Sequence, residues 1–162
     1  MSPFHDAAPA APAPLTLVLQ FDGGSRGNPG PAGIGVTLTA DDGTALYELG
    51  AFIGRATNNV AEYTALIRGL EAALAMGAAK VIVRADSELV IRQMTGMYRV
   101  KNARLLPLYQ QATALVAQLP ACTFSHTYRE GNTRPDALAN LAMDKKATVE
   151  PLGPLPRLRR PA

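Results

Sequence analysis

Four acidic residues of this sequence stand where expected strands end or expected helices begin: Asp22, Glu62, Asp86 and Asp136. Carboxylates crowded into one place repel one another, so such a cluster needs a reason to persist. The usual reason is a divalent cation that is held by their oxygens. Because the candidate ligands are all oxygen, Mg²⁺ or Mn²⁺ is favoured over zinc.

The elements that must position these residues are visible in the pattern of apolar residues. Strict alternation predicts the first strand, and a DG pair at 42–43 joins the next two into a hairpin. Apolar residues at helical spacing, followed by Gly77, predict the first helix, and KVIVRA reads as a strand buried on both faces. The expected strands are 15–21, 34–40, 45–53, 80–85 and 121–128, and the expected helices are 59–76, 87–94, 103–118 and 133–146.

Connectivity brings the four carboxylates to one edge of the sheet. The hairpins alternate the first three strands, and the helix that carries Glu62 returns the chain, so the fourth and fifth strands run parallel to the first. Neighbouring strands lie about 5 Å apart, which lets Asp22 and Asp86 reach a common ion. The predicted fold is α/β, with a five-stranded mixed sheet in the order 3-2-1-4-5 and helices on both faces. The carboxylates fall where its connections diverge, the usual place for a ligand.

Each carboxylate also has a purely structural interpretation. Asp22 opens a Gly-rich turn, and Asp86 is placed to cap the following helix. Glu62 stands at capping-box spacing from Asn59, and Asp136 complements a helix dipole. These interpretations do not explain why four element ends on one edge are all acidic, so a functional role is favoured.

Composition fits one domain of ordinary size. The chain has 162 residues, 48% of them hydrophobic, and a net charge of +3 that suits an anionic partner without requiring one. A single cysteine, Cys122, excludes an internal disulfide, and we expect a cytoplasmic setting.

The ends of the chain differ in composition from its centre. Residues 1–14 are rich in Pro and Ala and lack the apolar run of a signal peptide, so they predict a disordered leader. Residues 15–147 form the expected domain, and 148–162 a flexible Pro/Arg-rich tail. Nothing in the sequence predicts a membrane segment.

Four segments resemble the signature segments of the ribonuclease H type 1 family: FDGGSRGNPGPAGIG, ATNNVAEYTALIRGL, RADSELVIRQM and EGNTRPDALANLA. They occur in the family's order across nearly the whole expected domain, which is far more specific than one short motif. The resemblance implies a monomeric endonuclease that cuts the RNA strand of an RNA/DNA hybrid without sequence preference. It implies two Mg²⁺ or Mn²⁺ ions about 4 Å apart, and 5′-phosphate and 3′-hydroxyl products.

The resemblance also assigns roles to individual residues. It makes the four carboxylates both the metal ligands and the catalytic residues. The implied substrate-binding residues, which would face the minor groove and a DNA phosphate, are Gly23, Asn28, Thr57, Asn58 and Asn59.

The sequence departs from the family pattern in three places. The loop before the last helix lacks the usual His, so Arg129 or Glu130 would serve there, and His126 is excluded from the site. The basic handle of some members is missing, which leaves affinity to Arg99, Lys101, Arg104 and the C-terminal arginines. Glu88 stands where relatives often have Gln. Two other functions stay open: a noncatalytic nucleic-acid-binding module, and a broader nuclease that also cuts RNA/RNA duplexes or a DNA-linked ribonucleotide.

Overall fold

A computed structural model describes residues 14–156 of the chain. The leader predicted over 1–14, Pro14 apart, therefore lies outside the described residues, as do Arg157, Arg159 and Arg160. The elements are β1 (Thr16–Ser25), β2 (Gly30–Ala40), β3 (Ala45–Ala56), α1 (Asn58–Ala75), β4 (Lys80–Ala85), α2 (Glu88–Met94), α3 (Leu105–Ala117), β5 (Ala121–His126), the 3₁₀ turn η1 (Arg129–Gly131), α4 (Thr133–Lys145) and β6 (Thr148–Val149).

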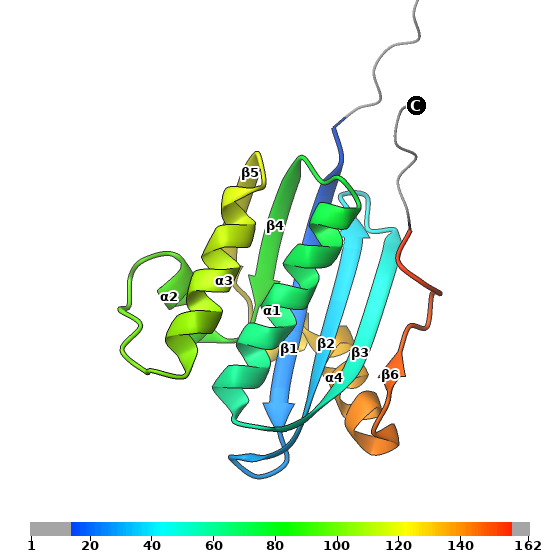
Figure 1. Cartoon of the computed structure of the whole chain (residues 1–162). Helices are drawn as coiled ribbons and strands as arrows, with labels where there is room; N and C mark the ends of the chain where they lie inside the picture. The colour runs from blue at the N-terminus through cyan, green and yellow to red at the C-terminus, as the bar shows by residue number, and fades with distance from the viewer. Residues whose placement is uncertain (1–13, 157–162) are drawn as a thin grey trace, which may run out of the picture.

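One mixed sheet forms the centre of the molecule, with its strands in the order β5-β4-β1-β2-β3-β6 (Figure 1). β1 pairs antiparallel with β2 and parallel with β4, and β4 pairs parallel with β5. α1 and α3 cover one face and α4 covers the other (Figure 1). The predicted α/β class, the order of the first five strands and the helices on both faces are confirmed.

The sheet has one strand more than the five predicted. Thr148 and Val149, which we expected to begin a flexible tail, pair antiparallel with Ala51 and Gly50 of β3. The following segment stays on the domain, since the Tyr47 hydroxyl donates a hydrogen bond to the Glu150 carboxylate. The outer edge of β3 is therefore partly covered, which hides backbone groups that an edge strand would expose.

β1 is longer than predicted and runs through the first half of the Gly-rich segment. Asp22 does not end the strand, because pairing with β2 continues to Ser25, opposite Ala32. Pairing with β4 stops earlier, at Gln20. Asp22 therefore lies on a strand held on one side only, just beyond the last residue paired with β4.

Two helix starts also differ from the predictions. α1 begins at Asn58 and is capped by the Thr57 hydroxyl, which accepts from the Val60 N–H. Asn59 is thus no cap, and Glu62 lies beyond the first turn rather than in it. α2 is capped by the Ser87 hydroxyl, so Asp86 does not fill that role.

The core forms between the sheet and α1. Its largest fully buried side chains include Phe21 of β1, Tyr63 of α1 and Val83 of β4. Within residues 14–156, none of the helices combines the length and the apolar character that crossing a membrane requires.

Candidate active site

All four predicted carboxylates line one open hollow of about 440 Å³ at the edge of the sheet where the pairing of β1 with β4 stops. We call it the acidic hollow. Its wall consists of Asp22, Gly23, Gly24, Asn58, Asn59, Glu62, Asp86, Arg129 and Asp136. The hollow thus brings together eight of the residues that the sequence singled out: the four carboxylates, Gly23, Asn58, Asn59 and Arg129. Glu130, the predicted alternative to Arg129, does not line the hollow.

Two glycines allow α1 and α4 to approach the sheet. A Cβ atom on Gly23 would lie 2.3 Å from the backbone carbon of Ala61 and 2.5 Å from the backbone nitrogen of Glu62. A Cβ atom on Gly35, which is opposite Asp22 in β2, would lie 1.8 Å from the carbonyl oxygen of Pro135. Because neither atom exists, α1 and α4 come close enough to place Glu62 and Asp136 beside Asp22.

The start of α4 is anchored further by an ion pair with β3. Arg134 donates from Nε and Nη2 to the two carboxylate oxygens of Glu48, at 3.0 and 2.8 Å. Glu48 is buried, so this two-point contact is better shielded than an ordinary surface pair. Asp136, two residues further along α4, is held over the acidic hollow by this anchor.

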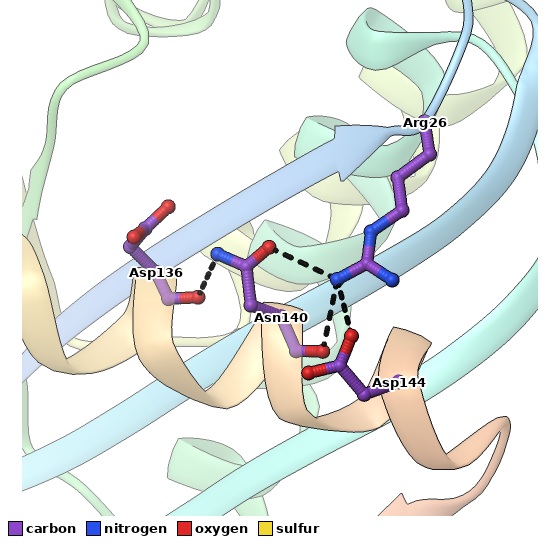
Figure 2. Close-up of polar contacts among 4 residues, drawn as sticks. All are labelled: Arg26, Asp136, Asn140 and Asp144. Carbon is purple, nitrogen blue, oxygen red and sulfur yellow. Dashed lines mark hydrogen bonds and ion pairs between the residues drawn. The ribbon is translucent and has the colours of Figure 1, made fainter.

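Arg26 ties the loop after β1 to the same helix (Figure 2). Its Nη2 atom lies 2.7 Å from the Asp144 carboxylate and 3.4 Å from both the carbonyl and side-chain oxygens of Asn140. Asn140 in turn donates to the carbonyl oxygen of Asp136 at 3.0 Å. Polar contacts therefore run along α4 from the loop to the backbone of Asp136.

Asn132 is a site residue that the sequence reasoning did not single out. Its side chain is almost completely buried, and Nδ2 donates to the carbonyl oxygen of Phe21 at 2.8 Å and to the Asp86 carboxylate at 3.1 Å. One amide thus fixes the orientation of Asp86 relative to the end of β1. The signal available in the sequence was its place within EGNTRPD, one of the four motif segments.

Two carboxylates of the hollow, Asp22 and Glu62, have raised pKa values. Burial raises the pKa of Asp22 to about 8, and the Asp86 charge and a hydrogen bond with Asp136 push it in the same direction. Burial also raises the pKa of Glu62 to about 7, against a hydrogen bond from Ser87 that lowers it. Ionising all four groups together is therefore unfavourable unless a positive charge enters the hollow.

The donor set fits a hard divalent cation. Its oxygens come from carboxylates alone, as Mg²⁺ and Mn²⁺ prefer. Among residues 14–156, no three acidic, His or Cys side chains are already gathered at the spacing of a metal site. The carboxylates instead surround an open space, in which burial and the charge of Asp86 disfavour the ionised forms of Asp22 and Glu62.

A second hollow, of about 340 Å³, adjoins the first and shares Asn59 with it. The predicted substrate-binding residues Asn28 and Thr57 line it, and so does Arg104. The Asn28 side-chain oxygen accepts from the Asn58 N–H, so this loop is braced against the start of α1. Its full lining is Asn28, Thr57, Asn59, Val60, Asn102, Arg104 and Leu105.

Other predicted residues lie elsewhere. Arg99 and Lys101 are exposed between α2 and α3, and neither lines the two hollows. Glu88 is exposed and pairs with Arg92 of its own helix. His126 is also exposed and stands apart from the acidic hollow, in keeping with its exclusion from the site.

A mixed sheet with helices on both faces, and with carboxylates from β1, α1, α4 and the residue after β4 gathered at one edge, defines the ribonuclease H-like class of folds. Comparison with protein families agrees: the family model described as "Reverse transcriptase-like" matches residues 20–142. Ribonuclease HI of Halobacterium salinarum is 42% identical over 144 residues, which cover 83% of this chain and 72% of that protein. The chain belongs to the ribonuclease H type 1 family.

Solved structures agree with this assignment. Ribonuclease H1 of Halobacterium salinarum superposes with a TM-score of 0.79 and 44% identity, over 80% of this chain and 98% of that one. The LC11 ribonuclease H1 in complex with an RNA/DNA hybrid gives a TM-score of 0.76 and 46% identity, over 80% and 98% of the two chains.

A longer relative shares the same region. The bifunctional protein Rv2228c of Mycobacterium tuberculosis is 52% identical over 134 residues, which make up 82% of this chain. This chain spans only 37% of that relative's length.

Proposed function

We propose that this protein is an endonuclease that hydrolyses the RNA strand of RNA/DNA hybrids. It would act without sequence preference and leave 5′-phosphate and 3′-hydroxyl ends. The observation that carries the proposal is the acidic hollow, which is lined by Asp22, Glu62, Asp86 and Asp136. This chain belongs to the ribonuclease H type 1 family, which gives that hollow its interpretation. The LC11 relative, whose structure contains an RNA/DNA hybrid, supports the choice of substrate.

The four carboxylates would hold two Mg²⁺ or Mn²⁺ ions. When bound, such ions activate a water for in-line attack on a phosphodiester and stabilise the leaving 3′ oxygen. The protein's part is to supply ligands that are already oriented. Asn132 orients Asp86 through its hydrogen bond. Gly35 positions Asp136 because its missing side chain lets α4 pack closely against the sheet.

Arg129 and the amides at the start of α1 would bind the substrate around the reacting phosphate. The Arg129 guanidinium provides positive charge in a wall that is otherwise acidic or neutral. Asn58 and Asn59 present amide groups beside the carboxylates, at the end of α1 whose backbone N–H groups favour anions. An A-like hybrid displays its 2′-hydroxyls in a wide minor groove, so amide donors there distinguish RNA without reading its sequence.

The second hollow would receive the backbone of the DNA strand. Arg104 supplies a charge for a phosphate, while Asn28 and Thr57 supply an amide and a hydroxyl. Asn59, which lines both hollows, connects this subsite to the cleavage site. We further propose a monomeric, cytoplasmic enzyme, and gel filtration tests the first of these points.

A substrate panel tests the proposed function. Purified protein is incubated with labelled RNA/DNA hybrid, RNA/RNA, DNA/DNA and single-stranded RNA of one sequence, each with Mg²⁺, Mn²⁺ or EDTA. Asp86→Asn serves as the inactive variant, and Asp41→Asn, an exposed carboxylate in the β2–β3 turn, is its matched control.

The expected result is metal-dependent cleavage of the hybrid's RNA strand that Asp86→Asn abolishes and Asp41→Asn retains. Binding of the hybrid without cleavage would support the noncatalytic module instead. Cleavage of RNA/RNA would support the broader nuclease. Treating the products with phosphatase and polynucleotide kinase identifies their ends.

A further inference from the structure

A third hollow, of about 480 Å³, lies between α2 and the end of β5. Its walls include Ile91, Met97, Phe124, His126 and Tyr128, so we call it the aromatic hollow. None of these side chains lines the acidic hollow or the second hollow. The activity proposed above therefore leaves the aromatic hollow without a role.

The aromatic hollow is marked by exposed apolar side chains. Tyr128 is 76% exposed and Met97 is 67% exposed, the two highest values among the large hydrophobic residues in the described part of the chain. The ring of His126 meets the ring of Tyr128 edge to face, at 5.6 Å between centroids. Single exposed hydrophobic residues are ordinary, but a group of them around one concavity marks a binding surface.

Charge in the aromatic hollow is neutralised within the protein. Arg92 lies 2.6 Å from the Glu88 carboxylate, and its guanidinium also stacks over the Tyr98 ring at 5.3 Å. Arg92 and Glu88 therefore satisfy each other rather than attract an ion. A flat, largely apolar ligand fits these walls better than a phosphate does.

The chain connects the aromatic hollow to the acidic hollow in two places. Tyr128 lines one and Arg129, the next residue, lines the other. Glu88 lines one and Asp86, two residues earlier, lines the other. Consecutive Cα atoms are about 3.8 Å apart, so the backbone that lines the aromatic hollow directly adjoins the backbone that lines the acidic hollow.

We propose that the aromatic hollow binds an unpaired nucleobase of a strand that leaves the hybrid beside the cleavage site. This inference rests on the proposed function, because it places a hybrid over the acidic hollow. Bases inside a duplex stack on one another and expose only their edges in the grooves, so they cannot present a flat face to Tyr128. A base in a single-stranded extension can, and stacking on an aromatic ring is indifferent to which base it is.

The inference predicts a preference for hybrids that end in a single-stranded extension. Stacking of one base on one aromatic ring contributes enough to tighten binding about tenfold. The preference concerns one of the four strand ends, because the aromatic hollow lies on one side of the acidic hollow.

The test compares a blunt hybrid with four otherwise identical hybrids that carry three unpaired nucleotides on one strand end each. Affinity is measured by fluorescence anisotropy in EDTA, and cleavage is measured in Mg²⁺. Four matching hybrids carry abasic extensions, which keep the phosphates and remove the bases. The variants are Tyr128→Ala, Tyr128→Phe, which keeps the ring, and Leu152→Ala, an exposed hydrophobic residue of the C-terminal segment as control.

We expect one extension to tighten binding about tenfold, its abasic form to give no gain, and Tyr128→Ala to remove the gain. Tyr128→Phe and Leu152→Ala should keep it, and cleavage of the blunt hybrid should stay within about twofold in every variant, since an exposed side chain leaves no cavity when it is removed. A gain that survives in Tyr128→Ala or with abasic extensions would overturn the inference. Equal affinity for the blunt hybrid and the four extended hybrids would also overturn the inference and would favour a protein as the partner of the aromatic hollow. Failure to cleave the blunt hybrid would refute the proposed function, and this inference with it.

Discussion

Replacing Asp22 with Asn should stabilise the metal-free protein at pH 8 while abolishing cleavage. The reason is the burial of Asp22 beside other carboxylates, which raises its pKa from 3.8 to about 8. In the unfolded chain the group ionises near pH 4, but in the folded protein it keeps its proton until about pH 8. The folded state therefore binds more protons over this range, so stability is complete below pH 4 and declines as the pH rises to 8.

The size of the effect follows from the same pKa values. Each pH unit over which one group keeps its proton only in the folded state costs about 1.4 kcal/mol. Between pH 5 and pH 8, Asp22 alone sets an upper limit of about 4 kcal/mol. Water enters the open hollow and relaxes part of this cost, so we expect a loss of about 2 kcal/mol. Glu62, whose pKa is raised to about 7, adds to the decline in the same direction.

Urea denaturation in EDTA at pH 5, 6, 7 and 8 measures this decline. The wild-type free energy of unfolding should fall across the series, and Asp22→Asn, which cannot ionise, should fall less and exceed the wild type at pH 8. Mg²⁺ at a hundredfold excess over its dissociation constant should restore about 2.7 kcal/mol to the wild type and little to the variant. If the free energy of unfolding fell equally steeply with pH in the two proteins in EDTA, the buried, crowded geometry of the acidic hollow would be refuted.

Four further substitutions test how the site is positioned. Asn132→Ala should lower the free energy of unfolding by about 2 kcal/mol, because it leaves buried polar groups without a donor, and should lower kcat more than it changes KM. Gly35→Ala should cost at least about 2 kcal/mol and most of the activity, because a methyl group there collides with the backbone of α4; normal thermal unfolding and cleavage would disprove that contact. Arg26→Gln and Asp144→Asn should each cost at most about 1 kcal/mol, with no additional effect in the double variant, as expected of an exposed pair. A loss of hybrid affinity in Arg26→Gln alone would show that Arg26 contacts the substrate instead of the helix.

Periodicity and connectivity predicted most of the fold correctly. The segments that contain Phe21 and Val83 were predicted as strands from their patterns of apolar residues. Both side chains are fully buried in the core. Once the hairpins and the crossover were assigned, the parallel pairing of β1 with β4 followed, and with it the common edge for Asp22 and Asp86. These inferences held because side-chain periodicity is a local property of the chain.

The capping residues were harder to predict, because several neighbouring residues compete for one helix end. Asn59 and Asp86 have the right chemistry for a cap, yet Thr57 and Ser87 occupy the caps. Which residue becomes the cap depends on where the preceding strand ends and on the direction in which the chain leaves the sheet. For Asp86 it has a functional consequence, since a carboxylate that does not cap α2 is available to Asn132 and to a cation.

The sequence by itself determined the class of fold, the edge of the sheet that carries the chemistry and the four carboxylates on it, because these depend on residue type, spacing and chain direction. Only the tertiary structure decided what surrounds them. The close approach of α4 over Gly35, the buried amide of Asn132 on Asp86, the sixth strand on β3 and the aromatic hollow at Tyr128 all join residues that are distant in the chain. Such contacts depend on how whole elements pack against one another, which no local pattern of residues specifies.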